Sequence, residues 1–173
     1  ETGKVYKSTD SGATWTEIQR LGSETSVYSL VSLGSGVVLA GTAPTGKIFK
    51  STDSGATWTE IQRLGTETQV LSLASLGSGV VLAGTAPTGK IFKSTDSGAT
   101  WTEIQRLGTE TSVYSLVSLG SGVVLAGTLP TGKIFKSTDS GATWTEIQRL
   151  GSETYARSLV SLGSGVVLAG TAP

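Results

Sequence analysis

Short apolar runs separated by turn-forming residues make up the whole chain. Residues 26–33 are rich in β-branched, aromatic and aliphatic types, and residues 37–42 form a second apolar run too short for a helix. Residues 47–51 form a third run, and residues 58–64 form the most polar of the four. The pattern predicts four short strands. A helix over 58–64 is the alternative, since Glu, Gln, Arg and Leu favour helices, but seven residues bounded by turns favour a strand.

This four-strand pattern recurs every 43 residues, four times in the 173 residues. A fixed period of this length indicates a repeat architecture, and four antiparallel strands per unit is the size of one propeller blade. We therefore predict an all-β fold, a β-propeller of four-stranded antiparallel blades with four blades per chain. An open β-solenoid is the alternative, but its rungs normally contain fewer strands.

The register of the repeats predicts the blade boundaries within a single repeat domain, 1–173. Complete units span 26–64, 69–107 and 112–150. The chain begins at a third strand, near Lys4, and ends after a second one. We predict that the two terminal half-blades, 3–21 and 155–172, form one shared blade that closes the ring, because closure removes exposed strand edges.

One octet, Ser-Thr-Asp-Ser-Gly-Ala-Thr-Trp, occurs unchanged in all four repeats. Its Asp can accept hydrogen bonds from nearby N–H groups, its Gly allows positive φ, and its hydroxyls can close the same loop. The Trp can anchor the turn against the protein. We predict a structural turn, not a metal or catalytic site, because nothing nearby completes the oxygen shell of a cation. The residues concerned are Asp10, Trp15, Asp53, Trp58, Asp96, Trp101, Asp139 and Trp144.

The octet resembles the Asp-box, Ser/Thr-x-Asp-x-Gly-x-Thr-Trp, of BNR or sialidase-like β-propellers. All motif positions match in all four copies, and the surrounding repeat covers the chain. The resemblance implies that the box is the turn between the third and fourth strands of a blade. It also implies that the box lies opposite the active-site face and has a structural role. An extracellular location is implied by the resemblance alone.

The composition of the chain limits which partners and cofactors it is expected to bind. Formal net charge is zero, so repetition builds no basic patch for nucleic acid or an anionic membrane, and we predict neither as a partner. The chain has no Cys and no His, which removes thiol chemistry and the commonest general base and metal ligand. We predict no cofactor and no metal. It does not start with Met and carries no signal peptide, which predicts a processed chain, a fragment or an engineered piece.

Variation among the repeats is confined to a few columns, four of them at the start of each unit's first strand. In an up-and-down blade, the loop entering this strand and the loop after the second strand lie on one face, so the variation collects at one mouth of the central channel. Tyr and Arg commonly anchor recognition sites. We predict a ligand-binding site there; drift after recent duplication, or residual asymmetry in an engineered repeat, is the alternative. Its residues are Tyr28, Gln69, Tyr114, Tyr155 and Arg157.

The repeats and the composition are consistent with three functions to different degrees. Near-identity of the repeats favours a non-catalytic scaffold, structural or ligand-binding, that was recently amplified or designed. A glycan-binding, lectin-like module at the channel mouth is the alternative. A sialidase-like glycosidase rests on the resemblance alone, and it would need an arginine cluster and two carboxyls flanking one bond. Only Arg157 lies on a first strand, and no Asp exists outside the octets. Nothing marks one of the loop glutamates as an acid (Glu24, Glu67, Glu110, Glu153), and we predict no enzyme.

Self-association is the predicted assembly. Bulky side chains on the first strands, such as Tyr28, Tyr114 and Arg157, would crowd the axis of a four-bladed ring. We therefore predict that two chains join as one eight-bladed ring, with a glycan as a further candidate partner. A single chain closing as a four-bladed ring is the alternative, followed by other assemblies.

Overall fold

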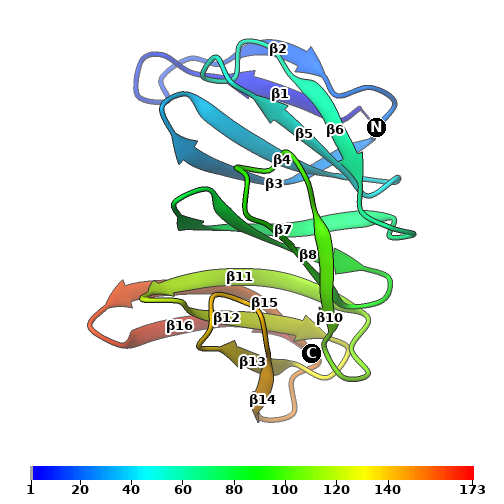
Figure 1. Ribbon diagram of the computed structural model, residues 1–173, viewed down its shortest axis with the longest axis vertical. Helices are drawn as coiled ribbons and strands as arrows, with labels where there is room; N and C mark the ends of the chain where they lie inside the picture. Colours follow the sequence, from blue (N-terminus) through cyan, green and yellow to red (C-terminus); the bar gives the residue numbers. More distant parts are fainter. Residues whose placement is uncertain (1) are drawn as a thin grey trace.

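The structure, a computed structural model, describes residues 2–173, which form sixteen strands and no helix (Figure 1). Three sheets have four antiparallel strands each, in the orders β3-β4-β5-β6, β7-β8-β9-β10 and β11-β12-β13-β14. The strands of these three sheets are β3 (Ser26–Gly34), β4 (Val37–Ala43), β5 (Lys47–Ser51), β6 (Thr59–Arg63), β7 (Gln69–Gly77), β8 (Val80–Ala86), β9 (Lys90–Ser94), β10 (Thr102–Arg106), β11 (Ser112–Gly120), β12 (Val123–Leu129), β13 (Lys133–Ser137) and β14 (Thr145–Arg149).

Sequential strands pair as neighbours throughout, which confirms the all-β blade architecture. The strand predicted over 58–64 is confirmed as β6, and the alternative helix does not form. Side chains at the start and end of each outer strand are exposed, because this strand is the edge of its sheet.

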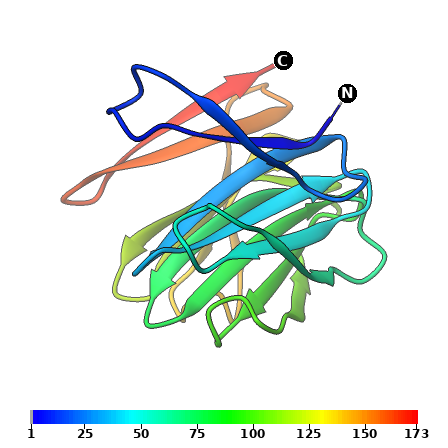
Figure 2. The same cartoon turned by 90° about the horizontal axis from the view of Figure 1, so that it is seen from above.

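Two half-blades flank the complete sheets. One contains β1 (Lys4–Lys7) and β2 (Thr16–Arg20), and the other contains β15 (Tyr155–Gly163) and β16 (Val166–Ala172). In Figure 1, β1-β2 lies at one end of the long axis, and β15-β16 lies in the opposite half, beside β11 and β12 of the third complete blade. They overlap in Figure 2 only because that view looks along this axis. The blade predicted from 3–21 and 155–172 is therefore not formed within one chain: β1-β2 and β15-β16 are separate sheets.

The first strand of each blade contains a bulge at the variable column. In the β3–β4 ladder, Val27 pairs with Thr42 and Ser29 with Gly41, so Tyr28 is an extra residue without a partner. A bulge bends the strand and redirects the side chain of the extra residue. The same irregularity recurs in each first strand, at Leu71, Tyr114 and Arg157.

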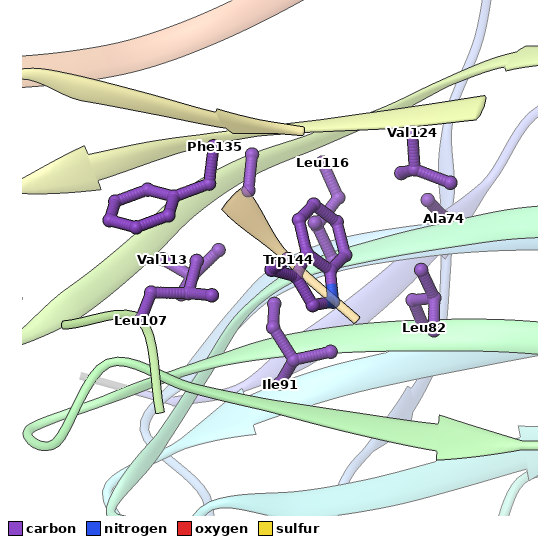
Figure 3. Close-up of a cluster of buried hydrophobic side chains, with 10 residues drawn as sticks. Ala74, Leu82, Ile91, Leu107, Val113, Leu116, Val124, Phe135 and Trp144 are labelled. Atoms are coloured by element: carbon purple, nitrogen blue, oxygen red, sulfur yellow. The ribbon is translucent and has the colours of Figure 1, made fainter. Parts of the chain in front are cut away.

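The core lies between blades. Figure 3 shows a cluster in which Leu82 of β8 and Phe135 of β13 are drawn with Trp144 from the octet of the third blade. The octet Gly allows this packing: a Cβ on Gly141 would lie 2.7 Å from Leu82 Cδ1. Each blade therefore buries its apolar face only against its neighbours, as in other repeat proteins.

Hydrogen bonds also connect successive blades. The Gln62 side chain donates from Nε2 to the Trp101 carbonyl of the next blade at 3.4 Å. On the inner side, the Leu73 N–H donates to Ser29 Oγ at 3.0 Å. The interface between blades is thus apolar in the middle, and hydrogen bonds connect the blades at its inner and outer margins.

Candidate functional site

Each octet is a turn closed by its own side chains. Asp53 accepts hydrogen bonds from Ser51 Oγ at 2.7 Å, the Thr57 N–H at 2.9 Å and Thr57 Oγ1 at 2.7 Å. Trp58 Nε1 donates to the Gly55 carbonyl at 3.2 Å. The predicted positive φ occurs at Gly55, and the preceding Ser54 adopts it as well, with φ 60°, which the sequence did not indicate.

These hydrogen bonds hold the octet carboxylates in the ionised state. The hydroxyl of Thr14, followed by that of Ser8, lowers the pKa of Asp10 from 3.8 to about 2. In the second octet the Thr57 backbone N–H is the largest cause, and the pKa of Asp53 also falls well below its ordinary value. The hydroxyls of Thr100 and Thr143 do the same to the pKa of Asp96 and Asp139. A carboxylate that accepts several bonds and stays ionised is poorly suited to act as a general acid.

The loops separate into two faces as expected from the strand order. On one face, the Ser54 N–H of the octet donates to the Gly36 carbonyl of the Gly-Ser-Gly hairpin at 2.8 Å. On the other, the Thr25 N–H, just before the first strand, donates to the Ala43 carbonyl at 2.8 Å. The second face is called the variable face below, because the variable columns begin there.

A buried glutamate ties the loops of the variable face together. Glu67 is fully buried and accepts hydrogen bonds from Thr85 Oγ1 at 3.0 Å, from the Thr88 N–H at 3.3 Å and from Thr88 Oγ1. Glu24 and Glu110 occupy the same position in their blades. The sequence placed these glutamates in loops without a role; the Thr residues that lie 18 and 21 positions further on were the signal that could have revealed it.

Three of the five predicted ligand-binding residues come together. The rings of Tyr114 and Tyr155 lie edge to face with centroids 6.2 Å apart. The Arg157 guanidinium carbon lies 4.4 Å from the Tyr155 centroid and 5.5 Å from the Tyr114 centroid. These residues lie near the starts of β11 and β15, on the variable face. Arg157 forms no ion pair with any carboxylate of residues 2–173.

Tyr28 and Gln69 lie away from this cluster. The Tyr28 side chain is half exposed and lines a hollow of about 220 Å³ between β1 and β3, with Tyr6 and Leu30 among its other lining residues. Gln69 is the half-buried first residue of β7. The single chain therefore gathers Tyr114, Tyr155 and Arg157 and leaves Tyr28 at its other end.

The outer strands carry one lysine–glutamate pair per repeat. Lys47 Nζ lies 2.8 Å from Glu60 Oε2, and the equivalent pairs are Lys4–Glu17, Lys90–Glu103 and Lys133–Glu146. The hydrogen bond with its glutamate raises the pKa of Lys4 and Lys133, and that with Lys4 lowers the pKa of Glu17. Among residues 2–173, no three acidic side chains are grouped so that they could hold a metal ion. Nor do these residues contain a helix of membrane-spanning length and hydropathy.

Comparison with known proteins identifies the fold. No family model matches the chain, and no curated protein matches it. Among solved structures, the extracellular domain of the putative one-component system BT4673 from B. thetaiotaomicron has a TM-score of 0.76 at 18% identity, covering 98% of this chain and 24% of that one. YCF48 from Cyanidioschyzon merolae has a TM-score of 0.73 at 14% identity, covering 99% of this chain and 59% of that one.

A glycoside hydrolase is also similar. The GH74 enzyme of Niastella koreensis has a TM-score of 0.66 at 23% identity, covering 83% of this chain and 25% of that one. These structures are β-propeller proteins, so the chain has the fold of a propeller built from repeated blades. It spans between about a quarter and three fifths of the length of the three structures.

Proposed function

We propose that this protein is a non-catalytic propeller scaffold that binds a carboxylate-bearing glycan on its variable face. The observation that carries the proposal is the cluster of Tyr114, Tyr155 and Arg157. Tyr rings offer flat surfaces that pack against sugar rings, and their hydroxyls can donate to sugar oxygens. Arg157 is an exposed cation without an acidic partner among residues 2–173, and a guanidinium matches a carboxylate with two parallel hydrogen bonds.

The disposition of the carboxylates supports a role without catalysis. Glycoside hydrolysis normally needs two carboxyls on either side of one bond. The four octet aspartates are acceptors within their own turns, and Glu24, Glu67 and Glu110 are buried under the loops. Four more glutamates pair with lysines on the outer strands. Among the side chains of residues 2–173 only Glu153 is left, and a single carboxyl does not supply both an acid and a nucleophile.

We assign the octet to the Asp-box type as part of this proposal. Its hydroxyl–carboxylate bonds, its Trp and its position between the third and fourth strands support the assignment. The octets lie on the face opposite the variable face, so a ligand on the variable face leaves all four turns free to stabilise the blades.

A peptide is the second candidate ligand. The structural neighbour "YCF48 bound to D1 peptide" has a TM-score of 0.59 at 18% identity, covering 73% of this chain and 42% of that one. A peptide carboxylate would use the same Arg157.

Binding to a glycan array tests the proposal. We expect carboxylate-bearing glycans to be retained, and Arg157→Ser to weaken retention about tenfold or more, because a charge-assisted hydrogen bond contributes roughly 1.5–3 kcal/mol. Arg106→Ser, at an exposed outer-strand arginine, is the matched control and should bind like the unaltered chain. Retention of peptides alone would favour the second candidate. Hydrolysis of a fluorogenic sialoside, or equal losses in the two variants, would contradict the proposal.

A further inference from the structure

Side chains that are buried in complete blades are exposed at the two ends of the chain. Leu39 and Leu82 are fully buried, each against the octet of the next blade, whereas the equivalent Leu168 on β16 is 56% exposed. Trp58, Trp101 and Trp144 are buried, whereas the equivalent Trp15 is 63% exposed. The repeats differ little in sequence, so the exposure arises because the blade that would cover these side chains is missing at each end.

Each end also carries a hollow. One, between β1 and β3, is lined by Lys4, Val5, Tyr6 and residues 27–30 of the first inner strand. The other has about 210 Å³ and lies on the third blade, lined by Lys136, Thr138, Thr143, Thr145 and Ile147 of β13, β14 and the octet between them. The first hollow is where the inner two strands of a preceding blade would lie. The second is where the outer two strands of a following blade would lie.

The free edges of the half-blades match each other in sequence. In the first blade β4 pairs with β5, with Leu39 opposite Lys50 and Ala40 opposite Phe49. Strand β16 has the same sequence as β4, and β1 differs from β5 by Val5 for Ile and Tyr6 for Phe. The repeat register therefore places Leu168 opposite Lys7 and Ala169 opposite Tyr6, if the two edges meet.

We propose that these edges pair between two copies of this chain, so that β15-β16 of each copy and β1-β2 of the other form a complete blade. Two such joints close a ring of eight blades with two-fold symmetry. Closure by a second copy satisfies both ends at once and leaves no free edge. Within one chain β1-β2 and β15-β16 are separate sheets in opposite halves of the molecule, so a single copy does not bring the two edges together.

Polar groups at the ends support the same joint. Gln19 and Gln62 bond to the backbone of the Trp of the next blade, while the Gln148 side chain forms no hydrogen bond within residues 2–173. In the joint, Gln148 faces the backbone of the partner's Trp15. On the inner side, the Leu73 N–H donates to Ser29 Oγ of the preceding blade. With the same register in the joint, the partner's Leu30 N–H would donate to Ser158 Oγ.

The joint also supplies a hydrogen-bond partner that Glu153 lacks in the single chain. Glu24 and Glu67 bond to two threonines each, 18 and 21 positions further on. Glu153 has Thr171 at the first of these positions, and the repeat places the partner's Thr2 at the second. Within residues 2–173 of one chain the Glu153 carboxylate accepts no hydrogen bond, and it is partly exposed. The partner therefore contributes the threonine that this glutamate lacks.

The joint also explains why the predicted ligand-binding residues are divided between the ends. Tyr114 and Arg157 occupy the same bulge column of neighbouring inner strands, and the next member around the ring is the partner's Tyr28. Arg157 would thus lie between two tyrosines of that column, one from each chain. This part of the inference rests on the proposed function.

Cysteine cross-linking tests the joint, since the chain contains no cysteine of its own. In the double variant Lys7→Cys, Leu168→Cys we expect oxidation or a short bis-maleimide to give a covalent two-chain product. Lys7→Cys with Val167→Cys is the matched control: its second cysteine lies on the opposite face of β16, and it should cross-link poorly. A cross-link within one chain, a ladder of longer products, or equal cross-linking in the control would overturn the proposal.

A charge at Leu168 separates assembly from folding. Leu168→Lys should give a folded β-protein of single-chain mass, because Leu168 is exposed in the lone chain. The same charge at Thr102→Lys, on an exposed outer strand, should leave the assembly unchanged. An assembled Leu168→Lys chain would overturn the joint. If the unaltered chain is a two-chain particle that retains no ligand, the proposed function fails and the joint stands. If the chain retains glycans but stays a single copy, the joint fails and the proposed function stands.

Discussion

Replacing Glu67 by Ala tests the structural role of the buried glutamates. The carboxylate lies under the variable face and accepts three hydrogen bonds, from Thr85 Oγ1, the Thr88 N–H and Thr88 Oγ1. The Thr85 hydroxyl keeps an alternative acceptor, the Lys90 carbonyl at 3.1 Å. Thr88 loses both of its bonds. Two partly buried donors left without partners cost about 2–3 kcal/mol of unfolding free energy.

Thermal unfolding followed by circular dichroism measures this cost. For a chain of this size 1 kcal/mol corresponds to about 2–4 °C, so Tm should fall by roughly 5–10 °C. Glu60→Ala is the control, because Glu60 is exposed and pairs with Lys47 on the surface, where an ion pair contributes about 0–1 kcal/mol. Equal shifts for the two variants would refute the reasoning. So would a Glu67→Ala chain with unaltered Tm that had lost an activity.

Three further changes test the packing and the turns. Trp101→Ala should cost about 3–5 kcal/mol of unfolding free energy in urea titrations, because Trp101 is buried between blades, and an unchanged midpoint would contradict this. Gly41→Ala should cost about 1–3 kcal/mol in the same assay, because its Cβ would lie 2.6 Å from Val70 Cγ1, and a chain as stable as the original would refute the packing. Acid should lower Tm: the octet carboxylates have a pKa below the ordinary 3.8, so their stabilisation is complete above that pH and is lost as pH falls towards about 2, the pKa of Asp10. A Tm independent of pH across this window would show that the turns do not depend on their carboxylates.

The repeat made the fold predictable. The 43-residue period, the two turn types and the short apolar runs were sufficient to predict four strands per unit and their order, and the observed strands differ from the predicted ones by about one residue at each end. The left-handed Ser54 was not predictable, because its conformation comes from the closed hydrogen bonding of the octet and not from its own preference.

The candidate site was predictable only as a set of positions that vary between the aligned repeats. The sequence identified Tyr114, Tyr155 and Arg157 because they vary in otherwise uniform repeats, but their mutual packing depends on the bulge and on the rotation between neighbouring blades. The half-blades were predictable from the register, and the bulky side chains of the first strands favoured half-blades that do not meet within one chain, but the size of their separation was not predictable. That separation follows from the angle between successive blades, which side-chain packing and strand twist determine together.

The mass of the unaltered chain in solution tests the account most directly. Native mass spectrometry and light scattering at micromolar concentration should give a particle of twice the chain mass of 17.6 kDa, because the free edges of β1 and β16 and the exposed Trp15 and Leu168 are all covered when two copies join. The mass should stay constant on dilution until the chains separate. A particle of single-chain mass throughout this range, or one that grows continuously with concentration, would contradict the two-chain ring.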